Sequence, residues 1–370
     1  MKKAIAFGVI FIAGLYFLIA GQFFSKREQP APGRDITYRQ LTDMVGRSMR
    51  VPVPLNRVAL FGGPTGQIAI ILGVTHRLCA VTNTMKMSAL VREMMPQIAS
   101  LPGPRTVSGD INIESLLQSN PELVVAGSID GGIVEKKTRI PVAYLDDNMG
   151  LGIDQLKKEL RFYADVFQAE ARAEKYIAFA DRILSLVRSR TQDIPESERV
   201  SVFQGDSTSH LVTLGGDTFM QERIEMAGCI NSAQSVRTVG QRTGLHSGLG
   251  EVSMEQVIAW SPDILVINAG SIDELKADSQ WRAVKAVQTG RVYFQPAGIF
   301  IFNRPTAESA VIYPLWLAAT AYPDRFKDIS VSTEVKNFYR DICDLAVSDA
   351  QVEKVLSGAY ESLMIKGIKH

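Results

Sequence analysis

The 370-residue sequence lacks the residue patterns that mark most metal sites. It has three cysteines without CxxC spacing, and four histidines without an HxH or HxxxH pair. A disulfide framework, a thiolate zinc site and a bare metal ion held by histidines are therefore not expected. We expect Cys79, Cys229 and Cys343 to be small buried side chains, although the sequence leaves one bridge open.

The sequence also lacks an excess of charge of either sign, and it lacks catalytic motifs. Forty Lys and Arg nearly balance 39 Asp and Glu, so no basic field for nucleic acid is expected. There is no GxSxG, Walker A, HExxH or dinucleotide motif, so no catalytic residue is predicted. A 46% apolar composition is that of a globular chain, and 370 residues exceed one ordinary core. Two domains or lobes are therefore expected.

The segment over residues 1–25 predicts export or membrane anchoring. Lys2 and Lys3 precede an uncharged apolar run over residues 4–21, long enough to nearly span a bilayer as a helix. No cysteine offers a lipid attachment point, and no clean cleavage site follows. We expect either an uncleaved tether or cleavage near Gly21, with a buried helix of a cytosolic protein as the alternative. Residues 26–55 then form a tether and the start of the first lobe.

Strands alternate with helices between residues 56 and 150, which predicts an N-terminal α/β lobe with a mainly parallel sheet. Residues 151–194 differ, because Gly and Pro are absent between Ile153 and Ile194 and the apolar spacing is helical throughout. A short helix and a long one should connect the lobes there. The predicted strands of the first lobe are 57–61, 78–81, 122–126 and 141–145.

The alternation restarts over residues 195–322, which predicts a C-terminal α/β lobe, and residues 323–370 should form helices that pack on a lobe. Residues 253–268 align with residues 112–127 without a gap. Glu255 falls on Glu114, and Asp263 falls on Glu122. This internal repeat predicts two lobes of related topology.

Several motifs in one order resemble a known family. They are Asn112-Ile113-Glu114 leading to Asn120-Pro121-Glu122, Ser253-Met254-Glu255 leading to Ser261-Pro262-Asp263, and Gly290-Arg291-Val292-Tyr293. From about residue 56 to 339 the chain resembles the periplasmic-binding proteins of ABC importers for iron-siderophore, haem and cobalamin. The resemblance implies two lobes bridged by a long helix, with a ligand cleft between them.

The same resemblance implies the function. The chain would capture a metal chelate, a ferric siderophore first and cobalamin, haem or a nickel chelate as alternatives, outside the cytoplasmic membrane. Its partners would be an ABC permease and its ATPase subunit, it would be a monomer, and it would need no cofactor. We expect it in the periplasm or on the outer face of the cytoplasmic membrane.

Glu114 and Glu255 are the predicted permease-docking residues. Each lies in the first turn of a helix, where a carboxylate also complements the helix dipole. In the resembling family, the glutamates at these motif positions pair with arginines of the permease. Neither is needed for capping here, because Asn112 and Ser253 are natural N-caps, and Ser253 with Gln256 makes a capping-box pattern without Glu255.

Ligand contacts are expected where acidic residues are rare. Residues 44–92, 226–250 and 279–307 contain no Asp or Glu but several bases, which would give the cleft a positive potential suited to an oxygen-rich chelate. Scattered bases beside buried strands are the alternative explanation. The predicted ligand-binding residues are Arg304, Asn303, Arg242, His246, Met85 and Lys86.

An enzyme of two similar lobes, chelatase-like or nitrogenase-like, is the alternative class of function. It would need a titratable cluster in the cleft or cysteines at cluster spacing, and the sequence shows neither. An anchored sensory ectodomain could use the same lobes.

Overall fold

The computed structural model describes residues 36–62, 65–106, 108–147, 152–206, 209–237, 249–268 and 270–361. The chain separates into two compact units, residues 1–38 and 39–370, and the second contains both sheets discussed below. The predicted export segment lies outside the described residues. Within those ranges, no helix is both long enough and apolar enough to cross a membrane.

The first sheet has four parallel strands in the order β4-β3-β5-β6. They are β3 (Val58–Leu60), β4 (Leu78–Ala80), β5 (Leu123–Ala126) and β6 (Val142–Tyr144). All four lie within predicted strands. The helices of this half are α2 (Thr65–Ile71), α3 (Asn83–Met87), α4 (Ala89–Met94), α5 (Pro96–Ala99), α6 (Ile113–Gln118) and α7 (Ser128–Lys137).

The second sheet repeats this order. Its strands run β9-β7-β11-β12, all parallel. In both sheets, the strand that comes second in the sequence lies at one edge, and the strand that comes first lies between it and the third. They are β7 (Ser201–Gln204), β9 (Ile230–Asn231), β11 (Ile264–Ile267) and β12 (Val292–Phe294). The predicted two-lobed α/β fold with related topology is confirmed. The helices here are α10 (Phe219–Met226), α11 (Met254–Trp260), α12 (Ile272–Ala277) and α13 (Lys285–Gln288).

Some elements differ from expectation. The strand expected at 211–214 exists as β8 (Val212–Leu214), but it pairs antiparallel with β10 (Leu249–Glu251) outside the main sheet. The two-stranded sheet of β1 (Thr37–Thr42) and β2 (Ser48–Val53) was not expected, because its residues are mostly polar or exposed. Short 3-10 turns occupy Thr75–Arg77, Glu196–Glu198, Trp281–Ala283 and Pro323–Phe326.

Each sheet is apolar on both faces, because its strands alternate between two cores. In β11, Ile264 and Val266 join the large core that also holds the connecting helices, while Leu265 and Ile267 join a smaller core beneath α11. In β5, Val125 and Val124 divide between the large core and a third core in the same way. Such period-two alternation with both faces covered is typical of parallel sheets. Cys79, Cys229 and Cys343 are all buried and unbridged.

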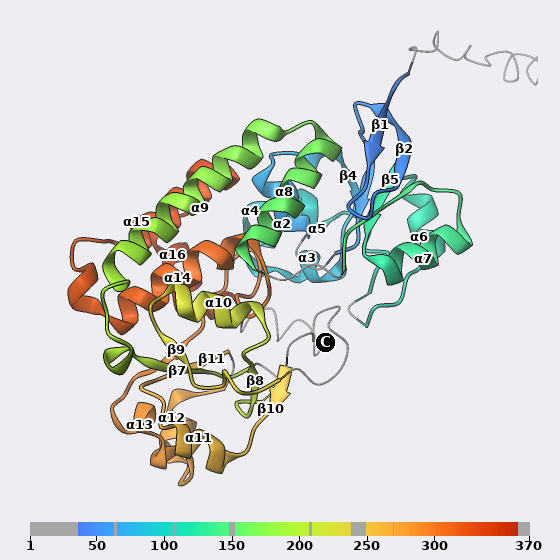
Figure 1. Cartoon of the computed structure of the whole chain (residues 1–370). Helices are drawn as coiled ribbons and strands as arrows, with labels where there is room; N and C mark the ends of the chain where they lie inside the picture. The colour runs from blue at the N-terminus through green and yellow to red at the C-terminus, as the bar shows by residue number, and fades with distance from the viewer. Residues whose placement is uncertain are drawn as a thin grey trace, which may run out of the picture. The chain divides into compact units, whose positions relative to one another are not determined.

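The connecting helices are α8 (Ile153–Phe167) and α9 (Glu170–Thr191), as predicted. Helix α9 packs against α14 (Ala307–Ala321), and the Tyr176 hydroxyl donates to the Ala307 carbonyl at 2.7 Å (Figure 1). The C-terminal segment comprises α15 (Val331–Asn337), a π-helical turn (Phe338–Ile342) and α16 (Asp349–Leu356). It contacts both halves, because Gln351 and Tyr360 donate to Glu93 while Val355 accepts from Ala297.

Candidate functional site

Polar side chains gather at the carboxyl edge of the second sheet. Gln204 ends β7 and Asp206 follows it, Asn268 follows β11, and Gln295 follows β12. All four are at most 2% exposed. In open parallel sheets, ligands bind outside the carboxyl ends of the strands. This edge of the second sheet is therefore the candidate ligand site.

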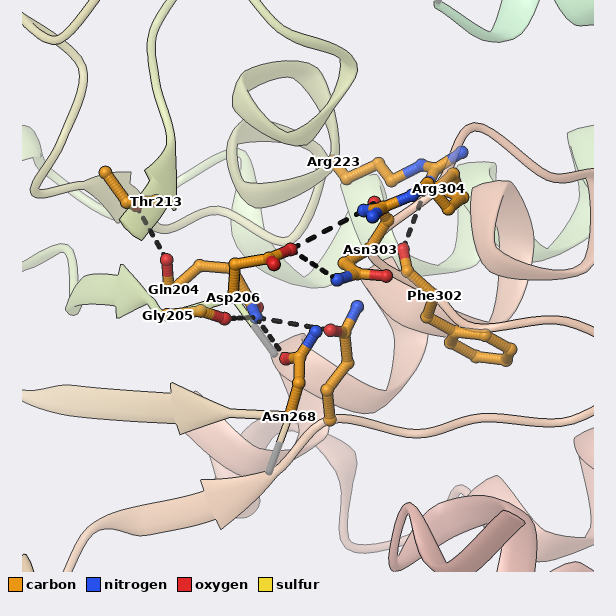
Figure 2. Close-up of polar contacts among 10 residues, drawn as sticks. Gln204, Gly205, Asp206, Thr213, Arg223, Asn268, Phe302, Asn303 and Arg304 are labelled. Atoms are coloured by element: carbon orange, nitrogen blue, oxygen red, sulfur yellow. Dashed lines mark hydrogen bonds and ion pairs between the residues drawn. The ribbon is translucent and has the colours of Figure 1, made fainter. Parts of the chain in front are cut away.

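Asn303 and Arg304 join these strand ends from the loop before α14 (Figure 2). The Asn303 Nδ2 donates to the Asp206 carboxylate at 2.7 Å, and the Arg304 guanidinium lies 3.5 Å from the same carboxylate. Arg304 is only 7% exposed, and burial lowers its pKa while Asp206 raises it. Asp206 thus orients Arg304 and offsets part of the cost of burying its charge.

The loop that carries Asn303 and Arg304 is held from behind by a second arginine. Arg223, on α10, donates to the carbonyls of Phe302, Arg304 and Thr306 at 3.0–3.3 Å. Thr306 then caps α14. Burial lowers the pKa of Arg223 to about 9, because its guanidinium is held among neutral carbonyls away from water. Arg223 is a structural residue, and Arg304 is the one whose side chain faces the cluster (Figure 2).

Amide side chains connect the strand ends. Gln204 Nε2 donates to Asn268 Oδ1 at 2.9 Å and to Gln295 Oε1 at 3.2 Å. Tyr313, on α14, donates its hydroxyl to Gln204 Oε1 at 2.8 Å. The three amides are therefore locked in orientation, with carboxamide N–H groups of Asn268 and Gln295 directed away from Gln204.

Several buried donors of this cluster have no hydrogen-bond acceptor among the described residues. They are Arg304 Nε, Gln295 Nε2 and Asn268 Nδ2, together with one amide acceptor, Asn303 Oδ1. Buried polar atoms are normally paired, and an unpaired one costs about 1–3 kcal/mol. Three N–H donors at one sheet edge are suited to a ligand that presents oxygen atoms.

Glu361 contributes a buried acid from the C-terminal segment. It is 1% exposed, and burial, followed by the Asp206 charge, raises its pKa well above the ordinary range. Arg304 and the Asn268 side chain oppose that shift, although the Glu361 oxygens form no hydrogen bond within the described part of the chain. Burial therefore favours the protonated form of Glu361 beside the Asp206–Arg304 ion pair.

The predicted ligand residues do not all lie in this cluster. Asn303 and Arg304 do. Met85 is 1% exposed in the large core, against Gly66, and Lys86 is partly exposed on the same helix α3 beside Gly103. Arg242 and His246 lie outside the described residues. The roles of all six remain predictions.

Sequence reasoning missed Asp206, Asn268, Gln295 and Glu361. The first three carried a usable signal, because each is a polar residue within two positions of the end of a buried parallel strand. Glu361 carried none, since its burial depends on how the C-terminal segment folds back. Among the described residues, no group of three His, Cys, Asp or Glu side chains could hold a metal ion.

A second polar feature lies on the same edge. His210, between β7 and β8, packs edge-on against Trp281 with ring centroids 5.8 Å apart. Its Nδ1 is buried without a hydrogen-bond partner in the ranges that the structure describes, and burial lowers its pKa.

A small separate pocket borders Gly152, Glu222 and Pro305. Glu222 there accepts from the Ile153 amide at 2.9 Å and so caps α8.

The predicted docking glutamates are both exposed, Glu114 on α6 and Glu255 on α11. Gln118 donates to Glu114 at 3.4 Å. Ser253 and Gln256 form the predicted capping box without Glu255. Neither carboxylate belongs to the buried cluster.

Comparison with known proteins agrees with this architecture. The chain is 24% identical over 330 residues to the molybdate-binding protein MolA of Haemophilus influenzae, covering 82% of this chain and 90% of that protein. The structure of MolA bound to molybdate matches with a TM-score of 0.70 at 23% identity, over 84% of this chain and 99% of that one.

Two further solved structures show the same fold. A periplasmic solute-binding protein from Veillonella parvula has a TM-score of 0.75 at 20% identity, over 88% of this chain and 99% of that one. Helicobacter pylori CeuE with Ni(II) bound has a TM-score of 0.66 at 18% identity, over 86% and 99%. The family model described as periplasmic binding protein matches residues 58–298, which is most of the chain. The chain therefore belongs to the periplasmic binding protein family.

Proposed function

We propose that this chain is the solute-binding component of an ABC importer and that it captures an oxygen-rich metal complex, with a ferric siderophore as first candidate. The observation that carries the proposal is the set of unpaired buried donors around Arg304 at the carboxyl edge of the second sheet. The family match supports solute binding for transport, and the donors support a ligand with several acceptor oxygens.

The buried arginine favours a ligand that carries negative charge. Arg304 keeps Nε unpaired although its guanidinium lies beside Asp206. A charged ligand oxygen would accept from Nε and from the neighbouring amides in a site of low dielectric, where such bonds are strong. Ferric hydroxamates, catecholates and citrate all present such oxygens. Most oxygens of cobalamin belong to neutral amides, and haem presents charged oxygens only at its propionates.

Molybdate is the second candidate, favoured by the likeness to MolA over most of both chains. This anion offers four oxygen acceptors and no donor, which matches the same three N–H groups. A ferric siderophore and molybdate differ greatly in size, so direct titration separates them.

The test has two parts. The full chain, purified in mild detergent, is first analysed for bound iron, molybdenum and nickel by elemental mass spectrometry. It is then titrated with ferric desferrioxamine, ferric citrate, molybdate, nickel with histidine, haemin and cyanocobalamin, with sulfate as the anion control. Tryptophan fluorescence reports binding, because Trp281 packs against His210 and Trp316 packs against Tyr313 near the cluster.

We expect saturable binding of one oxygen-rich metal complex per chain and no chemical conversion of it. Saturable binding of haemin or cyanocobalamin alone would contradict the proposed ligand class but leave the transport role. Conversion of any compound would contradict the transport role itself and favour a two-lobed enzyme.

We further propose that the chain works in the periplasm or on the outer face of the cytoplasmic membrane, held there or exported by its segment 1–25. It would deliver its ligand as a monomer to a permease whose ATPase subunit lies on the cytoplasmic side. Glu114 and Glu255 would dock on the permease, because both are exposed and lie at equivalent positions of the two repeats.

A further inference from the structure

Two exposed apolar side chains occupy the same position in the two repeats. Leu117 is 52% exposed on α6, and Ile258 is 37% exposed on α11. Their separation in the sequence equals the separation between Glu114 and Glu255. A single exposed leucine needs no explanation. The same exposure at the same place in both lobes is a repeated feature of the surface.

Each apolar residue lies beside a proposed docking glutamate. Leu117 follows Glu114 by three positions, and Ile258 follows Glu255 by three, so each pair shares one helix face. The residues just before them, Leu116 and Val257, are fully buried in their separate cores. The two helices therefore turn equivalent faces toward the cores of their lobes.

The ends of both helices are fixed in the same way. The side chain of Asn112 caps α6 by accepting from Ser115 N at 2.9 Å, and Ser253 caps α11 by accepting from Gln256 N at 3.2 Å. At the other ends, Asn120 and Ser261, which align with each other in the repeat, both adopt left-handed backbone angles, with φ of +45° and +47°. Both lobes thus display the same pair of side chains on helices that begin and end alike.

We propose that Glu114 with Leu117 and Glu255 with Ile258 form two equivalent contacts, through which the chain binds a permease that presents one basic and apolar surface twice. This inference rests on the proposed function. The partner would offer an arginine at each contact, whose guanidinium pairs with the glutamate and whose aliphatic stem covers the apolar side chain. An ionised carboxylate is what such a pair needs, and the backbone N–H of Glu255 and the Ser253 side chain hold the pKa of Glu255 below the ordinary range.

The two side chains of each contact would act on different steps. Exposed charges mainly speed and orient association, and their effect falls as salt rises. Apolar side chains covered on binding mainly slow dissociation. Loss of Leu117 and Ile258 should therefore shorten the life of the complex at any salt concentration, whereas loss of the glutamates should act most strongly at low salt.

The first experiment locates the contact. A benzoylphenylalanine is placed at position 117, 258 or 129 of the full chain in cells that make it, and the crosslinked partner is identified by mass spectrometry. Ile129 is the matched control, because it is 57% exposed on α7 and lies outside the repeated segment. We expect positions 117 and 258 to crosslink to one polytopic permease, and position 129 to do so at least about tenfold less. Crosslinks to a second copy of this chain, to no integral membrane protein, or equally from position 129 would overturn the inference.

The second experiment measures function. Leu117→Ser with Ile258→Ser should lower cellular uptake of the metal found in the purified protein at least about fivefold. The affinity of the purified double variant for that metal's complex should be unchanged. Ile129→Ser, the control, should have no effect on uptake. Normal uptake in the double variant Leu117→Ser with Ile258→Ser, beside lost uptake in Glu114→Ala with Glu255→Ala, would overturn the inference and leave the proposed function standing. Normal uptake in both variants would remove the docking role altogether.

Discussion

The Asp206 carboxylate fixes the position of the Arg304 guanidinium. An arginine buried alone would be costly, and burial does lower the pKa of Arg304, but the Asp206 carboxylate 3.5 Å away opposes that shift. Asp206 is in turn held by Asn303, which donates at 2.7 Å. The guanidinium is therefore fixed in direction before any ligand arrives, and such preorganisation lowers the entropic cost of binding.

Arg304→Ala should weaken binding of the oxygen-rich ligand about 10- to 150-fold, which corresponds to about 1.5–3 kcal/mol for a hydrogen bond to a charged group. Arg161→Gln is the matched control, because Arg161 is exposed and pairs with Glu174 on the connecting helices. Titration of each variant measures the effect. Unchanged affinity in a folded Arg304→Ala protein would assign Arg304 a structural role beside Asp206.

A second buried carboxyl gives a pH prediction. Glu308, fully buried at the start of α14, accepts from Gln67 at 3.0 Å and from the Tyr339 hydroxyl. Burial outweighs these hydrogen bonds and raises its pKa to about 7. The folded state therefore holds this proton up to about pH 7, whereas the unfolded state releases it near pH 4.5. The stabilisation of the folded state by this proton is complete below pH 4.5. It is lost as pH rises through about 7.

Between pH 5 and pH 8, this titration should lower the free energy of unfolding by about 2–3 kcal/mol, at about 1.36 kcal/mol per pKa unit. Glu308→Gln removes the titrating group while leaving an oxygen that can accept from Tyr339. The difference in stability between wild type and variant, measured by urea unfolding at both pH values, should therefore change with pH. A constant difference would show that Glu308 is ionised throughout.

At the scale of elements, the repeat explains how each lobe joins its strands. Glu122 and Asp263, each after a proline, bind the backbone amides that open the first strand of their own lobe. Glu122 accepts from Asn56 N at 2.6 Å and from Arg57 N at 3.0 Å, and Asp263 accepts from Ser201 N at 2.9 Å. One carboxylate per lobe thus joins neighbouring strands at their amino ends.

Asp263→Ala should therefore lower the free energy of unfolding by about 1–2 kcal/mol, because it leaves the half-buried Ser201 amide and hydroxyl without an acceptor. Asp324→Ala removes an exposed carboxylate paired with Lys327 and should have little effect. Thermal unfolding of both variants, monitored by circular dichroism, compares them. Equal melting temperatures would mean that the strand ends do not depend on this acid.

The same elements show what the sequence could and could not predict. Short apolar runs such as Leu123–Ala126 and Ile264–Ile267 were recognisable, because parallel strands covered on both faces are continuously apolar. The antiparallel pair of β8 and β10 was not, because β10 is very short and includes Gly250 and Glu251. Arg304 could be found as a base in an acid-poor stretch. Its partner Asp206 was missed although it follows the buried strand β7, because an acidic residue was not expected beside a positive ligand site.

At the scale of the whole molecule, the proposed ligand site and the proposed docking residues use different surfaces. The polar cluster is buried at the carboxyl ends of the strands, whereas Glu114 and Glu255 are exposed on helices that lead into β5 and β11 at their amino ends. A residue on one surface can therefore be changed without touching the other. This separation makes affinity and uptake independent measurements.

Glu114→Ala with Glu255→Ala should abolish uptake of the ligand's metal in cells and leave the affinity of the purified chain unchanged. Thermal stability should change little, since Asn112 and Ser253 still cap both helices. Lysine at either position should be worse than alanine, because it would face a permease arginine, and like charges at an interface repel. Asp273→Ala, which removes another exposed carboxylate from the first turn of a helix, α12, tests whether any such change has this effect. If affinity falls in parallel with uptake, the glutamates act on the ligand site and not on docking.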